Sequence, residues 1–126
     1  MTGKYIIGLD GGSQSSKATI FDTDGKVVCE ASQPLAPMHT PGSGIAEHPD
    51  DDLYTSLVAA ASRVMKAFPG DPAEIVGFGL CSIRCCRALV RSDGTLAEPV
   101  QSWMDDRLSR PYEHTNEEVA YVTTAS

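Results

Sequence analysis

The stretch KYIIGLDGGSQSSKATIFD, residues 4–22, decides the fold, because two apolar runs flank a polar centre. The runs at residues 5–7 and 18–21 favour β-strands. The polar centre, residues 11–16, consists of two glycines, three serines and a glutamine, with Asp10 at the entrance and Lys17 at the exit. The stretch therefore predicts a hairpin of two strands, residues 4–9 and 16–22, with a polar tip.

Two interpretations of this tip stay open on the residues alone. A glycine-rich phosphate loop normally leads into a helix, but here a strand follows, and neither the P-loop nor the dinucleotide-binding pattern is present. The first interpretation is a plain hairpin in which Asp10 caps the turn. The second is a phosphate site in which Gly11 and Gly12 would allow positive φ and close backbone approach, and the hairpin amides converge on an anion. In that site Asp10 holds Mg²⁺ through water, and the side-chain donors are Ser13, Gln14, Ser15 and Lys17.

The elements beyond the hairpin predict an α/β domain. An Asp-Gly turn at residues 22–25 leads to a third strand at 26–32, and turns this short require the first three strands to be antiparallel. A loop rich in proline and glycine follows at 33–46. A helix with an apolar stripe then begins near the acids at 50–52, which suit a helix start, and ends at Pro69. Further strands are expected at 74–82 (buried), 87–91 and 99–103, and two helical pieces beyond residue 104, interrupted near Pro111.

Composition excludes several classes of protein. The 126 residues suit one domain, and a net charge of −7 without a basic run argues against nucleic acid or an anionic membrane as partner. No signal peptide or membrane-spanning run is seen, so we expect a cytoplasmic protein. The four cysteines suggest reduced thiols rather than a disulfide framework. A zinc site among Cys81, Cys85 and Cys86 has no nearby histidine to complete it and is disfavoured. A catalytic cysteine stays an open alternative, although the three histidines are scattered in sequence.

Four segments together resemble the FGGY carbohydrate kinases of the actin/hexokinase/Hsp70 ATPase superfamily. DGGSQSSKATIFD (10–22) is similar to the family's D-x-G-T-x-S-x-[RK] phosphate motif, and GSGIAEHPDDDLY (42–54) to the segment before its first long helix. VGFGLCSIR (76–84) resembles the strand that leads to the sugar site, and VQSWMDDR (100–107) resembles I-x-W-x-D-x-R. The resemblance implies a ribonuclease-H-like (actin-like ATPase) mixed sheet with flanking helices.

The family resemblance also implies a function. It is phosphoryl transfer from Mg-ATP to a hydroxyl of a sugar or polyol, with ATP and Mg²⁺ as cofactors and a small carbohydrate as partner. Residues 1–126 would be the N-terminal portion of the first kinase domain. The rest of that domain, the second domain and the general-base aspartate would lie outside this chain, so we expect it to be inactive alone. The alternative is a non-catalytic nucleotide-binding or regulatory module of the same fold; a third option is a fragment that folds without binding a ligand, and a homodimer is compatible with each.

The resemblance assigns roles to single residues as well. Asp10 and Lys17 would be catalytic, with Asp10 also the metal ligand, and the nucleotide phosphates would meet Asp10, Gly12, Ser13, Gln14, Ser15 and Lys17. The substrate would meet Arg84, Cys85, Trp103 and Asp105. Cys85 stands where glycerol kinases carry a glutamate, which puts glycerol in doubt. From the residues alone, Arg84 could equally be a solvated strand-end charge and Trp103 a core or domain-packing residue.

Overall fold

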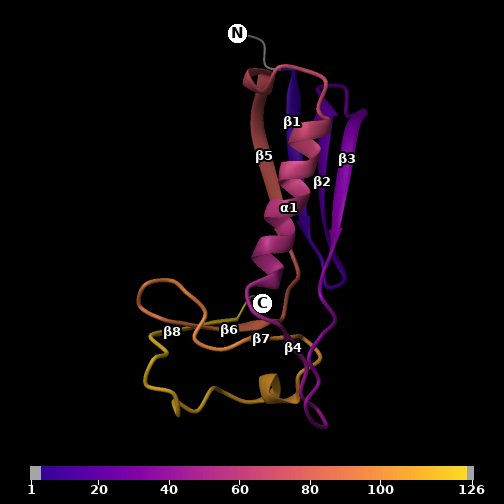
Figure 1. Ribbon diagram of the computed structural model, residues 1–126. Coiled ribbons are helices and arrows are strands. Elements are labelled where there is room, and N and C mark those ends of the chain that lie inside the picture. The colour runs from indigo at the N-terminus through magenta and orange to yellow at the C-terminus, as the bar shows by residue number, and fades with distance from the viewer. Residues whose placement is uncertain (1–3, 125–126) are drawn as a thin grey trace. The chain divides into compact units, whose positions relative to one another are not determined.

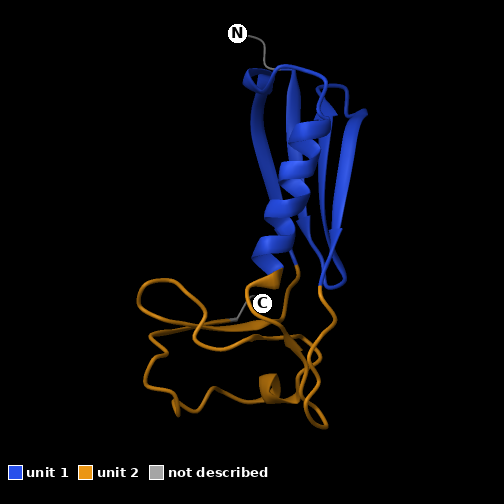
Figure 2. Cartoon of the chain, viewed as in Figure 1, with its two compact units in different colours: residues 1–35, 53–82 blue, residues 36–52, 83–126 orange. Residues whose placement is uncertain are grey.

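The computed structural model describes residues 4–124, and the chain divides into two compact units (Figure 2). Unit 1 comprises residues 1–35 and 53–82, and unit 2 comprises residues 36–52 and 83–126. Each unit contains a four-stranded sheet, with the order β3-β2-β1-β5 in unit 1 and β4-β7-β6-β8 in unit 2.

Unit 1 is a mixed sheet with one long helix on one face (Figure 1). The first three strands are successive antiparallel neighbours, as predicted, because turns of a few residues join them. The fourth strand runs parallel to the first, and the helix lies in the connection that leads to it. These elements are β1 (Tyr5–Gly11), β2 (Ser15–Asp22), β3 (Val27–Pro34), α1 (Asp52–Ala67), the short 3₁₀ helix η1 (Pro72–Glu74) and β5 (Ile75–Ser82).

The core of unit 1 lies between α1 and the centre of the sheet. Ala18 and Ile20 of β2 are fully buried, as are Ala60 and Val64 of the helix. Phe68 closes this core, and its ring meets that of Tyr5 edge to face at 5.0 Å. Since side chains alternate along a strand, residues 16, 18 and 20 face the helix, and residues 17, 19 and 21 face the opposite side.

The prediction that residues 74–82 form a buried strand is right in its bounds and wrong in its burial. Ile75 is half-buried, whereas the remaining residues of β5 are exposed. β5 is the edge strand of the sheet, and α1 packs on Ala18 and Ile20 of the inner strand β2. The apolar composition therefore predicted a strand, but it did not show whether another element packs on the face of that strand. β1 is likewise half-buried rather than buried.

Unit 2 is an antiparallel sheet of short strands. These are β4 (Glu47–His48), β6 (Arg87–Val90), β7 (Val100–Gln101) and β8 (Tyr121–Thr124). Its buried apolar side chains are Ala46, Cys86, Leu89, Val100 and Val119. The predicted strand at 99–103 is thus shorter than expected, and β4 directly follows the predicted loop at 33–46.

The prediction of two helical pieces beyond residue 104 is wrong. The structure has one 3₁₀ helix, η2 (Asp106–Ser109), and an extended segment that ends in β8. Asp105 caps η2, and Pro111 follows it closely. Tyr121, Val122 and Thr123 favour a strand and pair with β6. Residues 125 and 126 lie outside the described residues, and no helix in the described part of the chain is long and apolar enough to span a membrane.

Candidate functional site

The hairpin tip is closed by a backbone hydrogen bond between residues three apart. The amide of Gly12 donates to the carbonyl of Ser15 at 3.0 Å. A Cβ atom at Gly12 would lie only 2.8 Å from that carbonyl oxygen, so the turn closes because residue 12 has no side chain. Neither Gly11 nor Gly12 has a positive φ, although glycine would allow one. The close approach of two backbone segments is what requires glycine here.

Asp10 and Lys17 lie opposite each other on the two strands of the hairpin. They are paired in the β1–β2 register, which puts both side chains on the sheet face away from α1. On its other side Asp10 pairs with Cys81 of β5, whose thiol donates to Asp10 Oδ1 at 3.3 Å. This hydrogen bond raises the pKa of the Cys81 thiol above its usual value. Lys17 Nζ is 3.7 Å from Glu30 Oε1, a solvent-exposed pair that constrains the lysine weakly.

A hollow of about 430 Å³ lies on this same face of unit 1. Asp10, Lys17 and Cys81 line it together with Gly8 and Gly79, at which the sheet carries no side chains. A Cβ at Gly79 would meet no atom within 4 Å, so the glycine leaves open space rather than filling a tight contact. The hollow therefore combines an acid, a base, the Phe21 ring beside Gly8 and open backbone at Gly79, on a face that α1 does not cover.

The other predicted phosphate contacts are on the tip itself. Ser13 is half-buried, whereas Gln14 and Ser15 are exposed. The main-chain carbonyl of Gln14 accepts a hydrogen bond from the amide of Leu35, which ties the tip to the end of β3. The side chains of all three residues are thus available from a fixed backbone.

The predicted sugar-binding residues Arg84 and Cys85 lie in the turn before β6. Cys85 has a φ of 59°, a left-handed conformation that is uncommon for a residue with a side chain. Both side chains are exposed, whereas that of the next residue, Cys86, is buried. Burial raises the pKa of the Cys86 thiol. The strained backbone at Cys85 is typical of positions where a binding site fixes the chain.

Trp103 and Asp105 lie in different environments. Trp103 is 54% exposed, so it is not a core residue of unit 2. Asp105 is buried, and its carboxylate accepts hydrogen bonds at 2.7–2.9 Å from Ala46 N and from three nitrogens of Arg107. The Arg107 guanidinium also pairs with Glu47 Oε1 at 2.7 Å. These donors, Arg107 first, lower the pKa of Asp105 to about 2.

The predicted site residues thus fall into two groups. The residues predicted to bind phosphate, within 10–17, lie in unit 1. The residues predicted to bind the sugar, within 84–105, lie in unit 2. In the structure Asp10 and Lys17 line one hollow. The Asp105 carboxylate is bound by Arg107 and by the amide of Ala46. Within residues 4–124 no three side chains of His, Cys, Asp or Glu gather into a metal site, and all four cysteines are free thiols.

Sequence reasoning missed several buried polar residues of unit 2. His48, Arg87 and Gln101 are each more than nine-tenths buried, and each has a side-chain nitrogen or oxygen without a hydrogen-bond partner. For His48 burial lowers the pKa of the imidazole, which favours its neutral form. The available signal was a polar residue within each short apolar segment, AEH at 46–48, CRAL at 86–89 and VQ at 100–101.

Comparison with known protein families identifies the chain's relatives. Residues 5–124 match the N-terminal domain of the FGGY family of carbohydrate kinases. The chain belongs to this family. The FGGY assignment confirms the recognition made from the four sequence segments, and it agrees with the mixed sheet and helix of unit 1.

Curated FGGY relatives match over most of the chain. It is 59% identical over 126 residues to an Escherichia coli K12 protein described as an uncharacterized sugar kinase, YgcE, covering all of the chain and 26% of the relative. It is 33% identical over 110 residues to a glycerol kinase of Chelativorans sp., covering 85% of the chain and 21% of the relative. The chain therefore spans about a quarter or less of the length of these relatives.

Solved FGGY structures share the fold. A xylulose kinase from Brucella ovis superimposes with a TM-score of 0.74 at 24% identity, covering 82% of this chain and 22% of that one. A gluconate kinase from Lactobacillus acidophilus gives 0.71 at 24% identity, with 82% and 20% covered. At these identities the likeness supports the fold and no finer property.

Proposed function

We propose that the protein carrying this chain transfers the terminal phosphoryl group of ATP to a hydroxyl of a sugar or polyol. The observation that carries the proposal is the Asp10–Lys17 pair at the hollow on the uncovered face of unit 1. Membership of the FGGY family supports the same reaction class. Phosphoryl transfer needs mainly positioning and charge neutralisation, and an acid beside a base on a fixed hairpin suits both.

Lys17 and the hairpin tip would bind the triphosphate. The Lys17 ammonium is a compact charge on an exposed side chain, able to leave the weak Glu30 pair for a phosphate oxygen. Ser13, Gln14 and Ser15 would donate hydrogen bonds from the tip. Because the tip is held by the Gly12–Ser15 and Gln14–Leu35 backbone bonds, these donors are positioned before the nucleotide arrives.

Asp10 suits Mg²⁺ better than a metal ion that takes all of its ligands from the protein. Mg²⁺ in nucleotide sites is commonly held by one or two carboxylates, waters and phosphate oxygens. Asp10 is an exposed carboxylate with no second acid beside it in the hollow, which matches that donor set. When bound there, Mg²⁺ would neutralise charge on the phosphate oxygens. Asp10 would orient it through water.

Arg84, Cys85 and Trp103 would contact the carbohydrate. Arg84 offers donors to hydroxyls, and the exposed indole of Trp103 offers an apolar wall to the carbon face of a sugar. Asp105 would act by positioning, because its carboxylate is already bound to Arg107 and Ala46 N. Cys85 cannot accept hydrogen bonds as a glutamate does, so we propose an acceptor other than glycerol.

We further propose that the general base lies outside these 126 residues, which form part of the first kinase domain. The chain alone should then show no sugar-dependent ADP release. Turnover by the chain alone at the rate of the complete protein would contradict this.

The test of the proposed function is a panel of ketoses, polyols and sugar acids assayed with the complete protein. One acceptor should give turnover, and Trp103→Ala should raise the KM for that acceptor while changing kcat little. Tyr54→Ala, which removes an exposed aromatic side chain of unit 1, is the matched control. Nucleotide binding without turnover on any acceptor would favour the non-catalytic module instead.

A further inference from the structure

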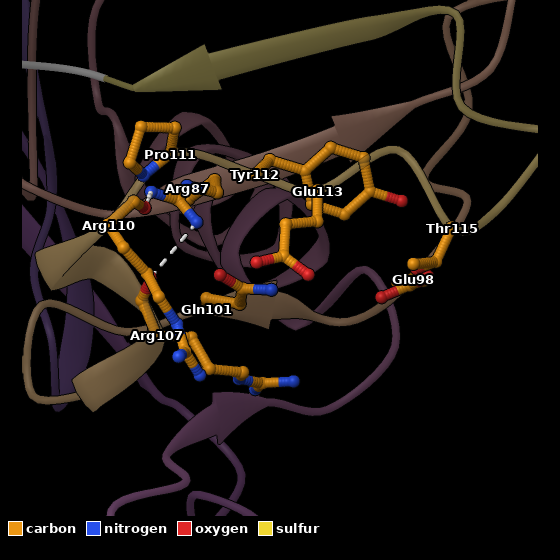
Figure 3. Close-up of a pocket in the computed structure, with 9 residues that line it drawn as sticks. All are labelled: Arg87, Glu98, Gln101, Arg107, Arg110, Pro111, Tyr112, Glu113 and Thr115. Atoms are coloured by element: carbon orange, nitrogen blue, oxygen red, sulfur yellow. Dashed lines mark hydrogen bonds between the residues drawn. The ribbon is translucent and has the colours of Figure 1, made fainter.

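Besides the hollow of unit 1, the structure has a cavity in unit 2 that is lined mainly by charged and polar side chains. It has a volume of about 240 Å³, room for roughly eight waters at ~30 Å³ each (Figure 3). None of the residues assigned above to the nucleotide or the sugar lines it. The lining residues are Arg87, Glu98, Gln101, Arg107, Arg110, Pro111, Tyr112, Glu113 and Thr115.

Arg87 brings a buried positive charge to this cavity. Only 6% of the residue is exposed, and its guanidinium donates to two backbone carbonyls, those of Arg107 at 3.2 Å and Arg110 at 2.6 Å. No carboxylate pairs with it among the described residues, and its Nε–H has no partner. A buried charge is costly without an anionic acceptor in contact with it, so the site favours an anion against Arg87 Nε–H, where no described side chain accepts.

Two further polar groups at the cavity lack hydrogen-bond partners. Gln101 is 3% exposed, and its Oε1 is an acceptor without a donor. The Tyr112 hydroxyl is also buried and unpaired. Figure 3 shows Gln101 and Glu113 turned toward the same space as the Arg87 guanidinium. An anion alone would not satisfy Gln101, because an acceptor needs a hydroxyl or amine hydrogen.

Some of the remaining charged side chains of the lining have ion-pair or hydrogen-bond partners, and others can bind a ligand. Arg107 is bound to Asp105 and Glu47, and Glu98 accepts from Asn116 at 2.9 Å. Arg110 and Glu113 are exposed, and no ion pair is recorded for either side chain within residues 4–124. The available set is therefore two guanidinium groups, one amide oxygen, one phenol and one carboxylate.

We propose that this cavity binds a small polyhydroxylated carboxylate, a sugar acid of about the size of gluconate. The carboxylate of the ligand pairs with Arg87 Nε–H and Arg110. Its hydroxyls donate to Gln101 Oε1 and Glu113 and meet the Tyr112 phenol. Waters could satisfy the amide and the phenol, but they would leave Arg87 Nε–H without an anionic acceptor. The site is additional to the proposed kinase function and does not depend on it.

The experiment is a calorimetric titration of the complete protein with gluconate, with glucitol and with acetate. Glucitol keeps the hydroxyls and lacks the carboxylate, and acetate does the reverse. Gluconate should bind at least about tenfold more tightly than either, since each charge-assisted hydrogen bond is strong and both parts of the ligand are needed. The Nε–H signal of Arg87 in NMR spectra should shift with gluconate only. No gluconate binding, or equal binding of all three, would overturn the proposal.

Three variants locate the site without removing the buried guanidinium. Arg110→Ala leaves the backbone carbonyl that holds Arg87 and should weaken gluconate binding about tenfold. Gln101→Met keeps the volume and should weaken it too, and so should Glu113→Gln, because an amide oxygen is a weaker acceptor of ligand hydroxyls than a carboxylate. Lys66→Ala, on α1 of unit 1, is the control for loss of one positive charge. Gluconate binding unchanged in both Arg110→Ala and Gln101→Met would place the ligand elsewhere and overturn the assignment.

Discussion

The family resemblance predicts that Asp105 contacts the substrate. In the structure the Asp105 carboxylate is bound by other residues of the chain. Its carboxylate joins the segment at Ala46 to the start of η2 and holds Arg107 against Glu47. The family motif predicted an acid and an arginine two residues apart, but it did not predict that they bind each other. The pattern supplied the residue types, and the fold decided their partners.

This arrangement predicts a specific acid sensitivity of unit 2. The folded pKa of Asp105, about 2, lies below its ordinary value of 3.8. Its contribution to stability is therefore complete above about pH 4 and is lost as the pH falls toward 2, a change on the order of 2 kcal/mol. Urea unfolding across this range should show a smaller loss of stability for Asp105→Asn than for the wild-type chain.

The matched control for this prediction is Asp106→Asn, because Asp106 is the exposed neighbour of Asp105. It should keep the wild-type slope of stability against pH. An Asp105→Asn protein whose acid dependence equals that of the wild-type chain would show that the Asp105–Arg107 pair contributes no pH-dependent stability.

Gly12 gives a second prediction at the residue scale. An added Cβ would meet the Ser15 carbonyl oxygen at 2.8 Å, and backbone cannot move aside as a flexible side chain can. Gly12→Ala should therefore lower the free energy of unfolding by about 1–3 kcal/mol. At Gly77 an added Cβ meets no atom within 4 Å, so Gly77→Ala is the control and should be near neutral. Equal stability of the two variants would refute this account of the tip.

At the scale of elements, the hairpins were predictable because their turns are local. The Asp22 carboxylate accepts from the amides of Asp24 and Lys26, and Gly25 has a φ of 81°, so four residues contain all the chemistry of that turn. The exposure of β5 depends on where α1 packs, and the strand β8 depends on pairing with β6. Both are contacts between distant residues, which no local pattern encodes.

α1 and β2 are joined by a buried hydrogen bond between Ser16 and Ser56, with the hydroxyl oxygens 2.8 Å apart. The Ser56 hydroxyl also donates to the Leu53 carbonyl at 3.3 Å, so Ser16→Ala removes one hydrogen bond but leaves Ser56 with a partner. The change should destabilise the chain by about 1 kcal/mol. The double variant with Ser56→Ala should cost less than the sum of the single changes, because the interaction is shared.

The control for this pair is Ser62→Ala, at an exposed position of the same helix. It should be neutral or slightly stabilising, because alanine favours helices. Additive effects of Ser16→Ala and Ser56→Ala in urea unfolding would show that the two hydroxyls do not interact in solution.

At the scale of the whole molecule, the same sequence segments predicted both the family and the candidate phosphate residues. The order of four short segments predicted the FGGY family, which the match over residues 5–124 confirms. The candidate phosphate residues came from the same segments, and the structure places Asp10 and Lys17 at one hollow. The cavity around Arg87 could not be predicted, because its lining residues are dispersed over residues 87–115 and meet only through the fold of unit 2.

The central claim is that the hairpin face bearing Asp10 handles the metal-bound triphosphate, and steady-state kinetics of the complete protein tests it most directly. Asp10→Ala should lower kcat at least about 100-fold while the KM for the carbohydrate changes little, because the proposed partner of Asp10 is the metal and not the sugar. Asp24→Ala, in the exposed turn between β2 and β3, should leave both constants unchanged. A kcat of Asp10→Ala equal to that of the wild-type protein would contradict the account.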